Sequence, residues 1–239
     1  DALLTVNRPV SIQPIRRWAD SSFSVAYRLR SIRPDPDRTD LSDLPWPEVP
    51  RSWERVYLAG PVPDEVAALA REITADTVGY YETVTALRDY LLHNYRYSLS
   101  PGVAVDGDQL SHFLFRSKRG YCSYFAFSMA LMARSLDIPS RVALGFLTDP
   151  QGGVIGFHPI RGDMAHAWVE VWFDGVGWVE FDPTSQIPAP GESMSFDHRI
   201  DRDRIVSLIE EILNRDTPPS EDIADEVKGE SADPGARRV

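Results

Sequence analysis

The chain has 239 residues and only one cysteine, Cys122. A single thiol cannot form an internal disulfide, and it cannot build a zinc site from several thiolates. Without further context, a lone cysteine is most often a small buried apolar residue, and that interpretation stays open for Cys122 at this point. The alternative is a reactive thiol, which depends on the residues around it.

Long apolar runs are also missing. No stretch of about 18 apolar residues occurs, so we expect no segment of this sequence to span a bilayer. No charged-then-apolar signal peptide opens the chain. Because the sequence begins at Asp1 rather than methionine, we expect a processed chain or a piece of a longer one, and membrane segments outside it stay open.

Positive charge is scarce. The chain carries 25 basic against 36 acidic residues, a formal net charge of −11, and shows no local basic patch. A nucleic-acid partner is therefore not expected. The acidic pairs near the C-terminus lack the spacing of a calcium-binding loop, so we predict no metal and no other cofactor.

The composition shifts twice along the chain, which predicts three regions. Residues 1–55 are expected to form a β-rich extension, whose end at Pro34–Pro50 is a proline-rich linker. Residues 56–190 hold the periodic segments described next. Residues 191–239 form an acidic segment with a disordered end. It includes one predicted amphipathic helix with the apolar stripe Ile205, Leu208, Ile209, Ile212 and Leu213.

Helical spacing of apolar residues predicts three helices in the central region. The first begins at Asp64, which we expect to cap it, and reaches Thr74. The second runs from Glu82 to about Tyr95. The third begins near Tyr121 and is apolar nearly all round, which is typical of a helix enclosed by protein.

Three later segments alternate as β-strands do, over residues 141–147, 166–173 and 177–181. Asp174 and Gly175 are turn residues between the last two, which favours an antiparallel hairpin. The predicted fold class is α+β, with a buried helix packed on an antiparallel sheet. Residues 148–163, which are rich in glycine, are either a lid or a plain connection.

Cys122 stands at the predicted start of the buried helix. A helix N-terminus lowers a thiol pKa through its unpaired N–H groups and the positive end of the dipole. Gly120 lets the chain turn into the helix, and Lys118 and Arg119 add positive charge nearby. This position favours a nucleophile over a buried structural cysteine.

His166 and Asp182 are the candidate partners of the thiol. A three-residue loop pairs Phe173 with Gly177, which brings Asp182 diagonal to His166 on one face of the hairpin. Taken alone, His166 is equally a core histidine, and Asp182 before a proline is more often a strand-ending residue. Their joint placement favours a catalytic pair. Alternation gives His166 three neighbours on its face of the strand, namely Trp168, Glu170 and Trp172.

Two stretches carry a family resemblance, RGYCSYFAFSMALMARSLDIPSRVALGF and MAHAWVEVWFDGVGWVEFDPTS. They resemble the bacterial transglutaminase-like superfamily of papain-like cysteine enzymes, in particular membrane-tethered members with an extracytoplasmic catalytic domain. Upstream, VYLAGPVPDEVAALAREIT and LRDYLLHNYRYSL are similar to the helical lead-in of the same proteins. The likeness covers about residues 55 to 186. Ser123 departs from it, since an acidic residue commonly follows the cysteine there.

The resemblance implies a papain-like core, with residues 56–190 as the catalytic domain. It implies a Cys122 thiolate that attacks a protein or peptide carboxamide and forms a thioester, which an amine or water resolves. His166 would move the proton and Asp182 would orient the imidazole. Open alternatives are a cysteine protease or peptidase of the same fold and a peptide-binding module without catalysis.

The resemblance also implies an extracytoplasmic, periplasmic or cell-surface location in a membrane-anchored protein. Substrate-cleft candidates are Tyr121 and Ser123, which flank the thiol, and Trp168, which shares the face of His166. We expect the other histidines to be surface or packing residues. They are His93, His112, His158 and His198.

Overall fold

The structure is a computed structural model of the chain. It describes residues 8–14, 27–32, 40–58, 60–148, 158 and 160–192. The chain divides into two compact units, and the described residues other than Pro14 and His158 belong to the one made of residues 1–13, 27–148 and 160–197. The predicted C-terminal helix lies outside the described residues, as does most of the predicted lid or connection.

The main sheet has three strands in the order β5-β6-β7, and both pairs are antiparallel. Their bounds are Ser140–Phe146, Ala165–Phe173 and Gly177–Phe181, which confirms the three predicted strands to within a residue or so. Phe173 pairs with Gly177, so the predicted three-residue loop and its register are also confirmed.

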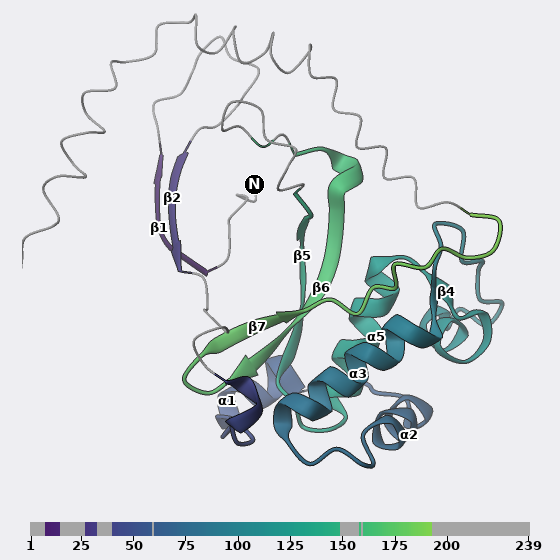
Figure 1. Cartoon of the computed structure of the whole chain (residues 1–239), viewed down its shortest axis with the longest axis horizontal. Coiled ribbons are helices and arrows are strands. Elements are labelled where there is room, and N and C mark those ends of the chain that lie inside the picture. Colours follow the sequence, from purple (N-terminus) through teal and green to yellow (C-terminus); the bar gives the residue numbers. More distant parts are fainter. Residues whose placement is uncertain are drawn as a thin grey trace, which may run out of the picture. The chain divides into compact units, whose positions relative to one another are not determined.

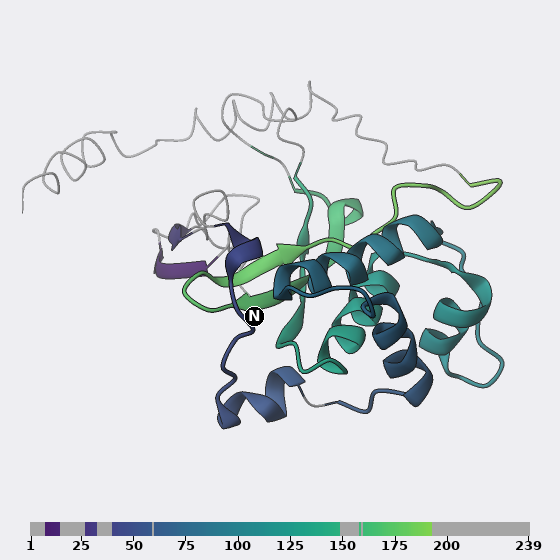
Figure 2. The same cartoon turned by 60° about the horizontal axis from the view of Figure 1, so that its bottom comes forward.

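Three helices cover one face of this sheet, as Figures 1 and 2 show. They are α2 (Asp64–Ile73), α3 (Tyr80–Asn94) and α5 (Cys122–Arg134). The three predicted helices are confirmed, with two corrections at their starts. Asp64 does not cap α2, because Pro63 holds the cap position and Asp64 is already helical. The second helix begins before Glu82, whose side chain instead accepts a hydrogen bond from the Gly79 backbone N–H.

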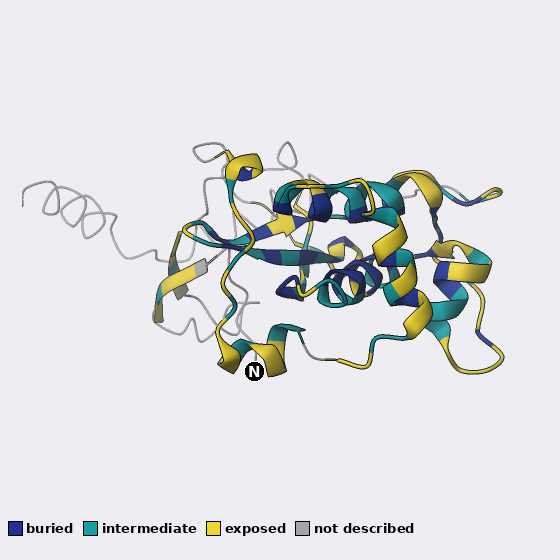
Figure 3. Ribbon diagram, turned by 90° about the horizontal axis from the view of Figure 1, so that it is seen from below, coloured by how far each residue is buried: buried dark blue, intermediate teal, exposed yellow. Residues whose placement is uncertain are grey.

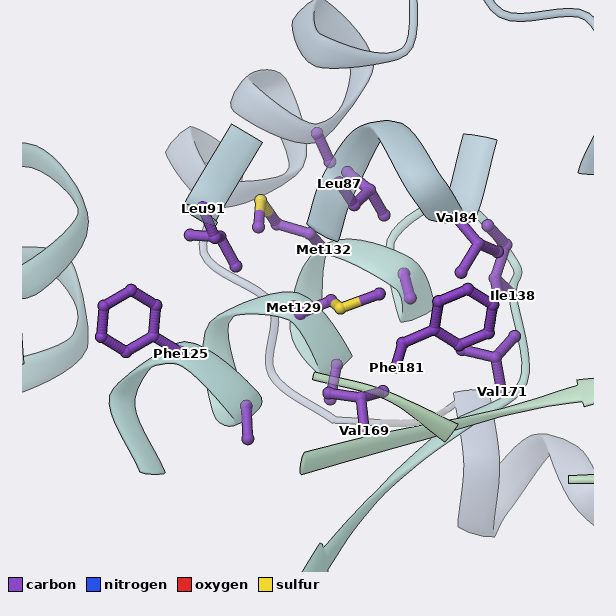
Figure 4. Packing of buried hydrophobic residues seen from close by; sticks show 14 of the residues in the cluster. Val84, Leu87, Leu91, Phe125, Met129, Met132, Ile138, Val169, Val171 and Phe181 are labelled. Carbon is purple, nitrogen blue, oxygen red and sulfur yellow. The ribbon is translucent and has the colours of Figure 1, made fainter. Parts of the chain in front are cut away.

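The core lies where α5 packs between the sheet and the other two helices (Figure 4). Met129 and Met132 of α5 are fully buried, and so are Val169 and Val171 of β6. Burying side chains of this size stabilises the fold by about 1.5–3 kcal/mol each. The alternation of β6 is strict: its odd-numbered residues from 167 to 173 face the core, and its even-numbered residues are partly exposed. Figure 3 shows the buried positions turned inward on the helices.

Aromatic side chains pack on the other face of the hairpin. Trp53, at the end of the short helix α1 (Arg51–Trp53), lies edge-on to Trp172 and stacks on Trp178, with ring centroids 5.0 and 5.8 Å apart. Arg141 lies over the Trp178 ring and pairs with Glu170. Trp178 therefore belongs to this structural cluster rather than to the cleft around the thiol.

The remaining elements are short. The strands β1 (Arg8–Pro14) and β2 (Tyr27–Ile32) form a two-stranded sheet within the predicted β-rich extension. The strands β3 (Arg96–Tyr97) and β4 (Arg119–Gly120) pair in parallel. The single turns are η2 (Leu41–Asp43), η3 (Glu54–Leu58), α4 (Gln109–Ser111), η4 (His112–Ser117) and η5 (Gly162–Met164). The pairing of β3 with β4 brings residue 97 next to the approach to α5.

Candidate active site

Cys122 is the first residue of α5, as the sequence predicts. Tyr121 precedes it in an extended conformation, and its side chain does not cap the helix. The N–H groups of the first turn therefore point toward the start of the helix, where the thiol lies. The ammonium group of Lys118 lies over the Tyr95 ring, 5.9 Å from the centroid.

Gly120 is needed here for space rather than for an unusual turn. A Cβ on this residue would lie 2.8 Å from Cβ of Tyr124 and 3.0 Å from the Phe113 ring. Real Cβ atoms essentially never come as close as the contact with Tyr124, and the contact with Phe113 is also unusually tight, so the backbone fits beside these two side chains only without a side chain of its own. Gly120 thus sets where α5 begins and, with it, where the thiol lies.

His166 and Asp182 meet across the β6–β7 hairpin. The imidazole Nε2 and the carboxylate Oδ2 are 2.8 Å apart. Asp182 follows the end of β7, and its other oxygen accepts a hydrogen bond of 2.9 Å from the Thr184 backbone N–H. The His166 side chain is only 9% exposed. A carboxylate held at both oxygens therefore fixes one ring nitrogen of a nearly buried imidazole.

His166 also interacts with Cys122, and this interaction lowers the pKa of the thiol. Because Nε2 is engaged by Asp182, Nδ1 is the atom left for the hydrogen bond between His166 and Cys122. The backbone of Ala167, the next residue in β6, also hydrogen-bonds the sulfur. His166 thus contacts Asp182 directly and interacts with Cys122 electrostatically, so the three predicted residues lie in one neighbourhood.

Burial and hydrogen bonding oppose each other in the pKa values of these three groups. Burial raises the pKa of the Cys122 thiol, but the hydrogen bonds from His166 and from two backbone N–H groups outweigh it and bring the pKa below its ordinary value. Burial lowers the pKa of His166, yet its bonds to Asp182 and Cys122 raise it to about 9. Burial raises the pKa of Asp182, but His166 and Thr184 lower it. A thiolate–imidazolium pair is favoured.

An apolar pocket of about 320 Å³ opens along the first turns of α5, and its lining residues flank Cys122 in the sequence without including it. Tyr121 and Ser123, two predicted cleft residues, line it on either side of Cys122 in the sequence. From α5 the exposed ring of Phe127 extends the same wall. Trp168, the third predicted cleft residue, lies instead against His166, with the two rings stacked at 6.4 Å between centroids.

Two residues near the thiol were not predicted from the sequence. Tyr97 lies beside Gly120 in the β3–β4 pairing, and burial followed by the charge of Cys122 raises the pKa of its phenol. Gly145 pairs with His166 across β5 and β6. A glycine inside a strand is a sign of close approach by another group, so the sequence did hold a signal for Gly145.

The other described histidines are His93, His112 and His158. His93 hydrogen-bonds the Asp89 carbonyl within α3, His112 begins η4, and His158 is exposed. His198 is outside the described residues. In the part of the chain that the structure describes, no group of three or more histidine, cysteine or acidic residues is placed to hold a metal ion.

A buried helix that starts at a cysteine and packs on an antiparallel sheet bearing a histidine and an aspartate defines an α+β, papain-like domain. The family model of the transglutaminase-like superfamily matches residues 67–183, a range that includes all three site residues. This region of the chain therefore belongs to the transglutaminase-like superfamily.

Individual relatives are consistent with this assignment. The protein YebA of Bacillus subtilis is 33% identical over 149 residues, which are 59% of this chain and 20% of YebA. A protein-glutamine gamma-glutamyltransferase of Pseudomonas aeruginosa is 29% identical over 180 residues, which are 70% of this chain and 26% of that enzyme. The chain thus spans about a fifth to a quarter of the length of these curated relatives.

Among solved structures, the chain resembles the periplasmic domain of TgpA from Pseudomonas aeruginosa. The sequences are 30% identical, the TM-score is 0.48, and the match covers 56% of this chain and 48% of that domain. In the described residues of the present chain, no helix is long and apolar enough to cross a membrane.

Proposed function

We propose that this domain transfers the acyl group of a protein or peptide carboxamide to an amine, through a thioester on Cys122. The observation that carries the proposal is the 2.8 Å contact between His166 and Asp182, together with the interaction of the same imidazole with Cys122, which begins α5. Similarity to a protein-glutamine gamma-glutamyltransferase supports a glutamine side chain as the acyl donor and transfer ahead of peptide cleavage.

In the first half of the reaction, the Cys122 thiolate forms a bond to the carboxamide carbon. The carbon–nitrogen bond then breaks, and Nδ1 of the His166 imidazolium gives its proton to the leaving nitrogen, which departs as ammonia. In the second half, an amine attacks the thioester and His166 takes the amine proton. The thiolate leaves, which restores the starting ion pair. Water in place of the amine gives deamidation.

Negative charge develops on the carbonyl oxygen during both attacks. The backbone N–H of Cys122, at the start of α5, is a donor of the kind that stabilises such an oxygen. The Tyr97 phenol, whose pKa burial and the charge of Cys122 raise, supplies a second hydrogen-bond donor in the surroundings of the thiol. Asp182 acts only through the imidazole, because it keeps Nε2 protonated and favours the imidazolium.

The test is mass spectrometry of glutamine-containing peptides incubated with the chain, with and without an added primary amine. We expect the peptide to gain the amine and lose ammonia, and the Cys122→Ala variant to give no product. Deamidation alone would indicate a hydrolase that acts on carboxamides. Cleaved peptides would indicate a peptidase of the same fold, and an unchanged peptide set would contradict the proposal.

For location, we propose that the domain works outside the cytoplasm as part of a membrane-anchored protein. The support is the resemblance of the motifs around Cys122 and His166 to membrane-tethered members of the superfamily. Labelling of Cys122 by a membrane-impermeant maleimide on intact cells that express the full protein tests it. Labelling only after lysis would contradict an extracytoplasmic site.

A further inference from the structure

Trp168 is packed against the imidazole of the candidate site. It lies two residues after His166 on the same face of β6, and the two rings are stacked with an interplanar angle of 19°. Asp182 and Cys122 engage the two ring nitrogens of His166, but the imidazole can still rock about the line that joins these two nitrogens. A second flat surface beside the imidazole restricts that motion.

The indole itself is seated on a glycine. Gly145 is the β5 partner of His166, and a Cβ there would lie 2.7 Å from Cη2 and 3.1 Å from Cζ3 of Trp168. The outer edge of the six-membered ring therefore lies directly against the backbone of β5. Gly145, Trp168 and His166 form one layer on this face of the sheet, in which a displacement of one ring presses on the next.

The polar atom of Trp168 gives no other reason for its position. Its Nε1 is buried, and no hydrogen-bond partner for it exists among the described residues. An unpaired buried N–H costs stability, so hydrogen bonding is not what makes tryptophan suitable here. The indole ring therefore contributes here through packing against its neighbours.

We propose that Trp168 is a positioning residue whose indole, seated on Gly145, holds the imidazole of His166 in the plane that joins Cys122 to Asp182. This inference rests on the proposed function, because it assigns a role within the same site. Gly145 acts on His166 only through Trp168, since it provides the space that the indole occupies.

The reactivity of Cys122 offers a readout that needs no substrate. Only one cysteine is present, so the rate of alkylation by iodoacetamide from about pH 5 to about pH 10 reports the thiolate of this residue alone. The titratable side chains that act on the thiol or its histidine are Tyr97 of β3 and Asp182 after β7, and neither is changed in the variants below.

Gly145→Ala is the most selective perturbation, because it removes no functional group. The new methyl group should push the indole and tilt the imidazole away from the thiol, which raises the thiol pKa. A rise of one unit lowers the thiolate fraction, and the alkylation rate below that pKa, about tenfold. Gly162→Ala is the matched control, since a Cβ there meets nothing within 4 Å. It should titrate as the parent chain does.

A second variant pair covers the case in which Gly145→Ala does not fold. Trp168→Phe shortens the ring and removes the atoms that the new methyl group would strike, whereas Trp168→Leu removes the aromatic plane. We expect Trp168→Leu to raise the thiol pKa more than Trp168→Phe does. If the Gly145→Ala and Trp168→Phe variants both fold, Gly145→Ala should raise the thiol pKa less in the Trp168→Phe background than in the parent chain. Such non-additivity is the sign of direct coupling between the two residues.

The outcomes separate this inference from the proposed function. A parent chain with a lowered thiol pKa and a Gly145→Ala variant with a raised one support the inference. A Gly145→Ala variant that is folded by circular dichroism and titrates as the parent does overturns it and leaves the proposed function intact. Equal titration of Trp168→Leu and the parent also overturns it. A parent thiol that titrates as a free cysteine contradicts both.

Discussion

The three site residues are placed by different local features. Cys122 owes its position to the start of α5 and to Gly120, which lets the chain pass under two aromatic rings. His166 is fixed by the strand alternation of β6, and Asp182 by the loop length that sets the register of the hairpin. At the scale of single residues, each group therefore has a role that a substitution can separate from the others.

Asp182→Asn keeps the size of the side chain but removes the charge that raises the pKa of His166. It also allows the opposite imidazole tautomer, with the proton placed away from Nε2. We expect turnover to fall about 10- to 1000-fold, less than in serine enzymes because a thiol is already partly ionised. Turnover and thermal midpoint should be measured on the same sample.

The matched control for this variant is Glu180→Gln, which removes an exposed carboxylate from β7 two residues earlier. It should leave turnover and thermal midpoint nearly unchanged. A lowered midpoint with unchanged turnover for Asp182→Asn would show that Asp182 supports the structure and takes no part in the chemistry.

The charge of His166 also predicts a pH dependence of stability. Its pKa is raised to about 9 in the folded chain, from an ordinary value of 6.5. The imidazolium therefore contributes stability in full below about pH 6.5 and loses that contribution as the pH rises through about 9. The thermal midpoint of the parent should exceed that of His166→Gln at pH 6, and the gap should narrow toward about pH 10. A gap that widens over this range would contradict the ion pair.

At the scale of elements, the start of α5 is the most constrained point near the site. Gly120→Ala should destabilise the fold by about 1–3 kcal/mol, as overpacking does in well-packed cores. The new methyl group meets Cβ of Tyr124, which cannot rotate away as the end of a long side chain can. Urea unfolding measures the effect, and Gly162→Ala is again the control in open space.

Equal stability of Gly120→Ala and the parent would mean that α5 shifts freely along the sheet. In that case the position of Cys122 would not depend on the packing around Gly120.

The elements that the sequence predicts well are those with a long, regular pattern. The helix α5 and the strands β5, β6 and β7 lie where apolar spacing places them, because each has a face that must be buried. Helix starts were less predictable. Asp64 has the composition of a cap, but Pro63 and its fixed backbone angle take that position.

The candidate site was predictable only in part, for a similar reason. Cys122, His166 and Asp182 could be found because helix starts and hairpin registers are local in sequence. Tyr97 could not, since its place beside Gly120 depends on a parallel pairing of two-residue strands. Gly145 and Trp168 meet across neighbouring strands, and no residue spacing specifies that the outer edge of an indole lies against a glycine.

At the scale of the whole molecule, contacts cross the predicted boundary at residue 55. Leu41 is buried in the core cluster, and the Trp46 ring lies edge-on to Tyr80 with centroids 5.0 Å apart. Trp53 packs on the outer face of the β6–β7 hairpin. The predicted linker thus includes residues that pack on the region from residue 56 onward, while the domain boundaries themselves stay a prediction.

Two fragments compare these alternatives. Residues 40–192 retain the contacts of Leu41, Trp46 and Trp53, and residues 56–192 lack them. We expect the shorter fragment to be less stable by about 3 kcal/mol or more, from the loss of one buried leucine and several ring contacts. Chemical denaturation of both fragments measures the difference. Equal stability of the two fragments would show that residues 40–55 add nothing to the free energy of unfolding and serve only as a linker.

The central claim is that Cys122 carries the acyl group during the reaction. Intact-mass spectrometry of the chain, quenched in acid within its first turnovers on a glutamine peptide, tests this directly. We predict an adduct equal to the peptide mass minus ammonia, located on Cys122, removed by hydroxylamine and absent from Cys122→Ala. Product formation by the Cys122→Ala variant, or an adduct on any other residue of the active chain, would contradict the claim.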